Sequence, residues 1–407
     1  MTLLGKAILV CKSFLFKLNN YWLYPLFVYI LFLKKKESFI NPQFWAEDSN
    51  IFFKDSVELG IQSCFIPYAG YLHLIQRIIA YIASKFSYEI IPHIYNYASL
   101  AVLLYTVWFC INHVDLFKNN KPIILLLALV PHSNEILVNL TNLHWYTSIY
   151  LGVLLLCDEK KFRGYFNLAF TVVCSFSGPF SIIILPFYIV KNLSSGTIKT
   201  WSPVRYSIVA GALTQIIILF NHKNAETIYL KLNFISEVLS ILVARVFYMQ
   251  KIYGECFNFY KVYFIIIFLL LNLIFFFLNK KKISLLLFYL YTVSIGILAA
   301  LKFKSQGIVD LLYFYPLSDR YFFSFNFAFL LLSIHSFVNY RKGIFTGIYI
   351  IFIFLYSLFT GTFFTHPHYR FVDYNWEEQA SMLEKGGYQR LFVNPRGWFV
   401  DVNASSE

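Results

Sequence analysis

Charged residues are scarce in this chain. Only 14% of its 407 residues are Asp, Glu, Lys or Arg, whereas 58% are apolar and the mean hydropathy is +0.61. A soluble globular chain carries about 25% charged residues, so the composition excludes an ordinary soluble domain. The apolar residues form continuous blocks, such as 263–278 and 344–359. Blocks approaching about 20 residues are typical of transmembrane helices, and a membrane β-barrel would instead show period-2 alternation.

Recognisable nucleotide-binding and catalytic loops are also missing. The sequence has no Walker loop, Gly-rich dinucleotide turn, nucleophile elbow or zinc-ligand spacing, so nothing favours chemistry on cytosolic nucleotide sugars. Its six cysteines are far apart and lie mostly inside apolar runs: Cys11, Cys64, Cys110, Cys157, Cys174 and Cys256. This spacing indicates neither a disulfide framework nor a metal site. We therefore expect no cofactor, and nothing in the sequence supports a divalent metal.

Basic residues outnumber acidic ones, 34 to 21, which gives a net charge of +13. Such an excess can indicate nucleic-acid binding. Here the basic residues are scattered over many short loops and form no Arg-rich face. This distribution indicates contacts with anionic membrane lipids and topology signals rather than a nucleic-acid partner.

The apolar blocks predict an all-α polytopic membrane protein with about 11 transmembrane helices. The predicted helices are 20–33, 93–112, 122–138, 143–157, 165–177, 179–190, 206–221, 260–278, 283–301, 320–338 and 344–363. Ser177-Gly178-Pro179 predicts either a tight hairpin within 165–190 or one kinked helix. No cleavage site follows the first apolar segment, so we expect it to remain as an anchor.

Short basic loops predict the orientation, because such loops favour the cytoplasm. On the predicted helices, the basic loops fall on one side of the membrane: Lys118 with Lys121, Lys160-Lys161-Phe162-Arg163, Lys191 with Lys199, Lys280-Lys281-Lys282 and Arg341-Lys342. This places the N-terminus inside, and the loop 34–92 and the tail 364–407 outside. Lys34-Lys35-Lys36 argues for the opposite orientation and is outvoted by the later loops.

Several segments share the predicted outer face. Tyr71–Phe86 and Ile235–Tyr253 are amphipathic and are expected to lie at the membrane interface. The tail 364–407 is too short for an independent domain, so we expect it to pack on a membrane domain that spans 1–363.

An acidic pair, Glu47-Asp48, follows the first apolar segment and is flanked by aromatic residues. Carboxylates at the mouth of a membrane bundle are costly to desolvate and usually serve chemistry or ion handling. Adjacent residues on a helix point about 100° apart, so both acids cannot face one substrate. One can act as a base while the other pairs with a cation or caps a helix.

Other polar residues on this face suggest partners for the acids. Arg77, Arg245 and Arg320, with His73, could hold a phosphate by charge-assisted bonds. A further group, at the turn between two predicted helices, consists of Glu135, Asn139, Asn142, His144 and Trp145. It could bind a sugar or a metal, or it could cap helices.

Phe44-Trp45-Ala46-Glu47-Asp48 resembles the first-loop acidic motif of membrane-embedded GT-C glycosyltransferases. More narrowly, the chain is similar to bacterial O-antigen glucosyltransferases that carry out serotype conversion of lipopolysaccharide, and to their uncharacterised relatives. The resemblance extends to Pro67-Tyr68-Ala69-Gly70-Tyr71, Asp319-Arg320-Tyr321 and Asn394-Pro395-Arg396-Gly397-Trp398. Ser49 and Arg396 depart from that pattern, which has Gly and Pro at these places.

The resemblance implies a GT-C-like bundle in the bacterial inner membrane and transfer of glucose from a polyprenyl-phosphate donor. The acceptor would be a lipid-linked O-antigen or other surface glycan on the periplasmic side, with inversion at the anomeric carbon. Asp48 would be the base and Glu47 would support it, with Arg77, Arg245, Arg320 and His73 at the donor phosphate. The glycan would contact Trp45, Glu135, His144, Asn394 and Trp398.

Two other classes of membrane protein stay open. A flippase or transporter of lipid-linked sugars would hold its acids near the bilayer midplane, in broken helices. An O-antigen polymerase or acyltransferase is the other alternative, and an acyltransferase would need a His base within the membrane. His93, His132 and His335 lie near predicted helices, but none has a paired acid in sequence.

Overall fold

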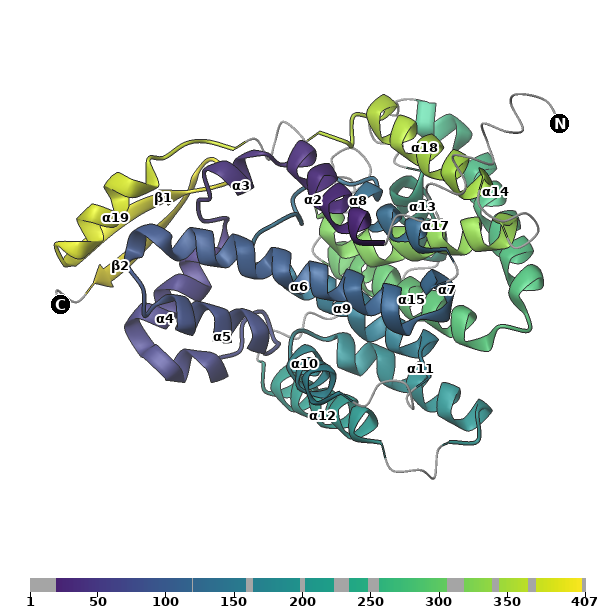
Figure 1. Cartoon of the computed structure of the whole chain (residues 1–407), viewed down its shortest axis with the longest axis horizontal. Coiled ribbons are helices and arrows are strands. Elements are labelled where there is room, and N and C mark those ends of the chain that lie inside the picture. Colours follow the sequence, from purple (N-terminus) through teal and green to yellow (C-terminus); the bar gives the residue numbers. More distant parts are fainter. Residues whose placement is uncertain are drawn as a thin grey trace.

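The computed structural model describes residues 20–118, 120–158, 164–197, 202–222, 234–247, 256–305, 318–338, 344–364 and 371–404. This part of the chain is mostly helical (Figure 1). Among the described residues, four helices are long and apolar enough to cross a membrane: α6 (Ile91–His113), α12 (Pro203–Asn221), α14 (Cys256–Asn279) and α15 (Ile283–Ser305). The predicted class of helical membrane protein is therefore supported. The total of about 11 spans stays a prediction.

Shorter helices complete the bundle and its rim. At the N-terminal side these are η1 (Asn20–Trp22), α2 (Leu23–Lys34), α3 (Glu37–Ile40), η2 (Asp48–Phe53), α4 (Lys54–Leu59), η3 (Gly60–Phe65), α5 (Leu74–Ala83) and η4 (Tyr88–Ile90). The middle holds α7 (Asp115–Lys118), η5 (Lys121–Ile124), α8 (Leu125–Leu129), α9 (Leu143–Val153), η6 (Leu154–Leu156), α10 (Tyr165–Ser175), α11 (Phe180–Ser194) and α13 (Phe234–Val246). The last helices before the tail are η9 (Asp319–Phe322), α17 (Phe323–Val338) and α18 (Ile344–Phe359).

Helix ends gather at two opposite ends of the bundle. In Figure 1, α6 runs from the end that carries α4, α5 and the tail toward α7. Near α7, Lys191 Nζ donates to Leu154 O at 2.7 Å, and Lys282 Nζ lies 2.6 Å from His335 Nε2. We call this the basic-loop end and the opposite one the acidic-turn end. The predicted membrane orientation stays a prediction.

The predicted helix 122–138 is wrong beyond Leu129. Residues 130–142 form an irregular segment that is buried throughout, with positive φ at Asn134 and Val138. Pro131 explains the break, since a residue that precedes proline is disfavoured in helical conformation, and Val130 has a non-helical ψ of 125°. Periodicity could not reveal the break, because a buried apolar segment looks the same whether helical or irregular.

Two lysines of the Lys34-Lys35-Lys36 run bind this irregular segment. Lys34 Nζ donates to the carbonyls of Ala128 and Val130 at 3.1 and 3.3 Å, and Lys35 Nζ donates to Leu137 O at 2.8 Å. Burial lowers the pKa of Lys35 to about 8, although the charges of Asp48 and Glu135 oppose this. Two of the three lysines that argued against the predicted orientation therefore donate hydrogen bonds to buried backbone carbonyls. Such carbonyls need donors where the helical hydrogen bonds are interrupted.

The amphipathic and hairpin predictions met different outcomes. Residues 165–194 form two separate helices, α10 and α11, joined by a turn at Gly178 (φ 85°), so the alternative of one kinked helix is wrong. Within Tyr71–Phe86, α5 forms as expected but buries Gln76 and Arg77. In the described part of Ile235–Tyr253, α13 packs against α14, α15 and α17, and its position at the membrane interface stays a prediction. Residues 248–253 lie outside the described residues.

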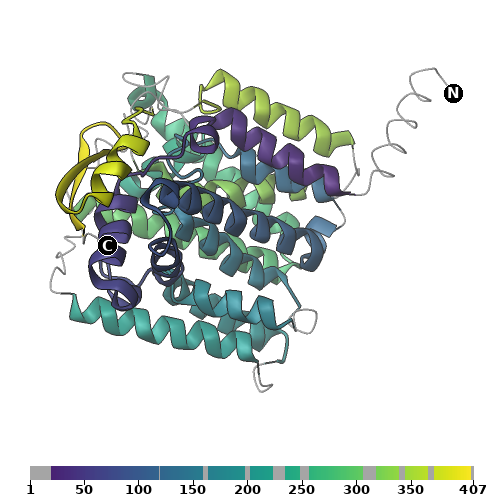
Figure 2. The same ribbon diagram turned by 60° about the vertical axis from the view of Figure 1, so that its left-hand side comes forward.

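The tail contains strands, which corrects the all-α prediction. After α19 (Trp376–Glu384), β1 (Gly387–Val393) and β2 (Trp398–Ala404) pair antiparallel, with Gly387 opposite Ala404 and Val393 opposite Trp398. Figure 2 shows this hairpin beside α19. Leu391, Val393, Val400 and Val402 are buried, which is the period-2 pattern of strands with one covered face. Residues 394–397, from the last of the resemblance motifs, form the hairpin turn.

The tail docks on the loop that carries the acidic pair. The Trp376 ring packs edge-on against Phe44, with centroids 4.6 Å apart, and its Nε1 donates to Tyr88 O at 3.0 Å. Gln43 Nε2 donates to Asp373 Oδ1 at 2.6 Å. A buried aromatic anchor with paired polar groups around it fixes the tail against the bundle, as expected.

A glycine lets α10 and α12 approach closely. A Cβ atom on Gly211 would lie 2.4 Å from the Ser175 carbonyl oxygen, which belongs to the backbone and cannot rotate away. We predict that Gly211→Ala lowers the free energy of unfolding by about 1–3 kcal/mol. Thermal unfolding in detergent measures the change. Gly347→Ala is the control, because no atom lies within 4 Å of its added Cβ; equal midpoints for the two variants would contradict this packing.

Candidate active site

The acidic pair lies in a tight turn at the acidic-turn end. Asp48 N donates to Trp45 O at 2.8 Å, Trp45 N donates to Asp48 Oδ2 at 3.2 Å, and Ala46 has φ 45°. The π-helical segment η2 starts directly at Asp48. Short π-helical segments are rare in proteins, and those that occur are often found at functional sites. The turn sends the two neighbouring carboxylates into different surroundings.

The tail fixes the shape of this turn through Asn394. Trp45 and Asn394 form a parallel bridge, in which Ala46 N donates to Asn394 O and Asn394 N donates to Phe44 O. The Asn394 side chain is buried and bonds Val372 on both sides, accepting from its N–H at 2.8 Å and donating to its carbonyl at 2.9 Å. The structure therefore places Asn394 as a brace. Trp398, also predicted to contact glycan, begins β2 and is 38% exposed.

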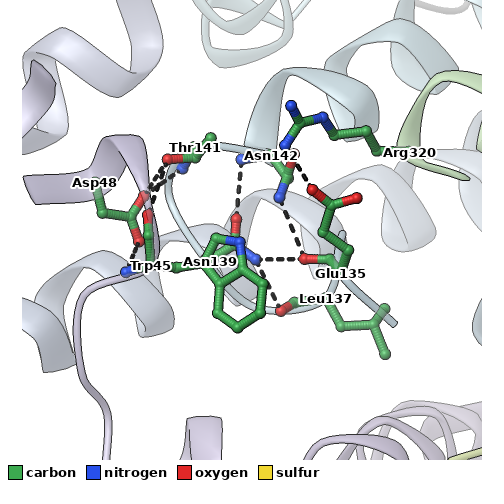
Figure 3. A network of polar contacts seen from close by, with 8 residues as sticks. All are labelled: Trp45, Asp48, Glu135, Leu137, Asn139, Thr141, Asn142 and Arg320. Atoms are coloured by element: carbon green, nitrogen blue, oxygen red, sulfur yellow. Dashed lines mark hydrogen bonds and ion pairs between the residues drawn. The ribbon is translucent and has the colours of Figure 1, made fainter. Parts of the chain in front are cut away.

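Asp48 is fully buried and holds two loops together (Figure 3). Its Oδ1 accepts from both the backbone N–H and the hydroxyl of Thr141, each at 2.6 Å. Burial raises the pKa of Asp48 to about 7, although the bonds from Thr141 and Trp45 oppose the shift. Both oxygens are thus occupied by donors of the protein itself. We call this set of bonds the Asp48 lock.

The irregular segment 130–142, which contains Thr141, has a second set of polar contacts, also seen in Figure 3. Asn139 Nδ2 and Asn142 Nδ2 both donate to Glu135 O, at 2.7 and 3.2 Å, and Asn142 N donates to Asn139 Oδ1 at 3.0 Å. Arg320 Nη1 then pairs with Glu135 Oε1 at 2.6 Å. These bonds give the segment a fixed shape without helical hydrogen bonds.

Each of the three candidate phosphate-binding arginines has a carboxylate partner. Arg77 pairs with Asp55 at 2.6 Å and donates to Ile51 O, and Arg245 pairs with Asp319. Arg77 and Arg245 are almost completely buried, whereas the Arg320 side chain is 20% exposed. Removing the partner of such a buried charge would be strongly destabilising. Among the three, Arg320 has the best access to a ligand.

Glu47 is the less buried member of the acidic pair. Its side chain is half-buried, and its Oε2 is a buried atom without a hydrogen-bond partner among the described residues. Tyr68 lies beside it: burial raises the pKa of Tyr68 to about 12, the Glu47 carboxylate adds to the shift, and Arg320 opposes it. A carboxylate, a phenol and an arginine are therefore neighbours at the acidic-turn end.

Two histidines lie next to this group. The rings of His73 and His144 have centroids 5.1 Å apart, and Gln76 Nε2 lies 3.0 Å from His144 Nδ1. Burial and the charge of Arg77 lower the pKa of His73 to about 4. His73 is thus neutral near pH 7 and does not supply the positive charge predicted for a phosphate contact. Trp45, predicted to contact glycan, is only 4% exposed and lies under Lys35 Nζ at 4.4 Å.

No protein-family model matches the chain, and comparisons with curated proteins and with solved structures gave no significant match. The site must therefore be interpreted from its own chemistry. Among the described residues, no three His, Cys, Asp or Glu side chains come together as metal ligands.

The structure brings together Glu47, Arg320, Glu135, His73 and His144, all of which the sequence analysis selected. All three arginines are paired with acids, but Arg77 and Arg245 are almost completely buried in their pairs, whereas Arg320 is partly exposed. Sequence reasoning missed Thr141 as the partner of Asp48, and no local pattern could have shown a contact across 93 positions. It also gave no role to Tyr68, although that residue stands inside one of the resemblance motifs.

The raised pKa of Asp48 predicts a pH-dependent stability. Folded Asp48 retains its proton up to about pH 7, whereas the unfolded chain loses it near the ordinary value of 3.8. Its contribution to the free energy of unfolding is thus present below pH 4 and lost as the pH rises to about 7. Relative to Asp48→Asn, wild type should lose up to about 1.4 kcal/mol per pH unit across this window.

Thermal unfolding of both proteins in detergent, from pH 5 to pH 8, measures this difference. His73 and Lys35 titrate in both proteins, so their effects largely cancel in the comparison. Asp158→Asn, at an exposed acid near the basic-loop end, is the control and should follow wild type. Parallel curves for wild type and Asp48→Asn would contradict the assignment.

Proposed function

We propose that this chain is a membrane-embedded glycosyltransferase that transfers a hexose, glucose by the resemblance, from a polyprenyl-phosphate donor to a lipid-linked or surface glycan. The observation that carries the proposal is the contrast within the acidic pair. Both oxygens of the fully buried Asp48 accept hydrogen bonds, whereas Glu47 is half-buried and its Oε2, itself a buried atom, has no hydrogen-bond partner in the described part of the chain. We therefore assign the base to Glu47 and the positioning role to Asp48.

Transfer from such a donor needs few parts. The Glu47 carboxylate takes the proton from the acceptor hydroxyl as that oxygen attacks the anomeric carbon, and the bond to the lipid phosphate breaks. Cations at the phosphate oxygens stabilise the leaving group. Arg320 and Lys302 suit this role, because both contact the same aromatic ring. Arg320 Cζ and Lys302 Nζ each lie 5.5 Å from the ring centroid of Tyr321. One base and direct displacement would invert the anomeric carbon.

The predicted orientation supports an extracytoplasmic site. The basic loops and the acidic turn lie at opposite ends of the bundle, and the dissenting lysines 34 and 35 are bonded to buried carbonyls. With the basic loops cytoplasmic, Glu47 and the tail face the periplasm of a bacterial inner membrane. There the donor and the acceptor would both be lipid-linked.

A flippase or transporter of lipid-linked sugars is the second candidate, and the irregular segment 130–142 favours it. Broken helices line substrate sites in many transporters. Here α8 has five residues and α9 has 11, so neither crosses a hydrocarbon core of about 30 Å. Against this reading, the acid of the segment, Glu135, is paired with Arg320 rather than left for a coupling ion.

We predict that Glu47→Gln lowers the transfer rate by on the order of 10²–10⁴, because a general base contributes this much. The assay is sugar transfer by the purified full chain in nanodiscs, from a short-chain polyprenyl-phosphate glucose to a lipid-linked glycan. Glu89→Gln is the matched control, an exposed acid at the same end of the bundle, and should retain wild-type rates.

Asp48→Asn separates the two roles of the acidic pair. It should reduce the rate less than Glu47→Gln does, since it disturbs the turn without removing the base. Wild-type transfer by Glu47→Gln would refute the assignment of the base. If wild type moves labelled lipid across vesicle membranes but transfers no sugar, the transporter is correct.

A further inference from the structure

Five rings form a continuous series at the acidic-turn end. Tyr68 and His73 have centroids 6.0 Å apart, His73 and His144 5.1 Å, His144 and Trp145 5.0 Å, and Trp145 and Tyr321 4.9 Å. These rings come from three separate parts of the chain: the loop before α5, the start of α9, and η9. The series starts beside Glu47 and ends beside Arg320 and Lys302.

Three rings of the series are half-buried and two are buried. Tyr68, His144 and Tyr321 are half-buried, as are Glu47 and Arg320. Behind them, His73 and Trp145 are 6% and 4% exposed and Gln76 is fully buried. The half-buried groups thus border a set of buried polar side chains, His73, Trp145 and Gln76, which we call the floor.

Four polar atoms of this floor have no hydrogen-bond partner among the described residues: both ring nitrogens of His73, Trp145 Nε1 and Gln76 Oε1. Trp145 Nε1 is a donor, and Gln76 Oε1 is an acceptor whose amide nitrogen is already bonded to His144. Buried polar groups are nearly always paired, and leaving them unpaired is costly. A donor and an acceptor near aromatic faces match the hydroxyl groups and the C–H faces of a sugar ring.

We propose that Trp145 and Gln76, with the rings of Tyr68, His144 and Tyr321, form the subsite for the sugar ring of the lipid-phosphate donor. The inference rests on the proposed function and adds residues to it. The anomeric carbon then lies between Glu47 at one side and the cations Arg320 and Lys302 at the other. The sugar's hydroxyls pair with Trp145 Nε1 and Gln76 Oε1, which the bare lipid phosphate cannot do.

The test compares two lipids on the purified full chain in nanodiscs: a short-chain polyprenyl-phosphate glucose and the same polyprenyl phosphate without sugar. Trp145→Phe keeps an aromatic ring and loses Nε1, and Gln76→Met keeps the length and loses the amide oxygen. Each variant should raise the Kd of the glycosylated lipid about threefold to tenfold, as expected for one hydrogen bond. The Kd of the bare lipid phosphate should stay unchanged.

Trp108→Phe is the matched control, because Trp108 lies on α6 and stacks on Tyr105, away from the acidic turn. It should leave both Kd values at wild type. Equal weakening of both lipids, or no change for either, in Trp145→Phe and Gln76→Met would overturn the subsite while wild type still transfers sugar. If wild type binds neither lipid and transfers nothing, the proposed function itself fails.

Discussion

The Asp48 lock is the constraint on which the rest of the site depends. A buried carboxylate joins the turn after the first apolar helix to the irregular segment between α8 and α9, through two bonds of 2.6 Å to Thr141. Desolvation of such a group is costly, and the donors of Thr141 and Trp45 offset part of that cost. Because the lock consumes both oxygens of Asp48, it leaves the neighbouring Glu47 as the carboxylate that can meet a substrate.

Charge pairing divides the remaining ionic groups into framework and site. Arg77 with Asp55 and Arg245 with Asp319 tie separate elements together in almost dry surroundings. Paired ions of this kind hold a structure in register but offer little to a ligand. Arg320 differs from these two arginines in its exposure, since it is paired with Glu135 yet partly exposed. The proposed chemistry therefore needs few groups, placed together by a framework that uses many.

The sequence was sufficient for the class of helical membrane protein, but not for the contacts that distinguish the residues of the candidate site. Long apolar blocks predict membrane helices because few other environments accept them. They cannot reveal an irregular buried segment such as 130–142, where lysines 34 and 35 replace helical donors. Nor could adjacent acids be distinguished, since the difference between Glu47 and Asp48 arises from contacts with Thr141, 93 positions from Asp48. The strands of the tail were missed because their alternation is short and interrupted by turn residues.

Mass spectrometry of the host's surface polysaccharide, with the gene present and with it deleted, tests the central claim most directly. The account predicts that the repeating unit carries one additional hexose only when the gene is present. An unchanged glycan together with accumulating lipid-linked intermediates would contradict it and would favour movement of lipid-linked sugars across the membrane.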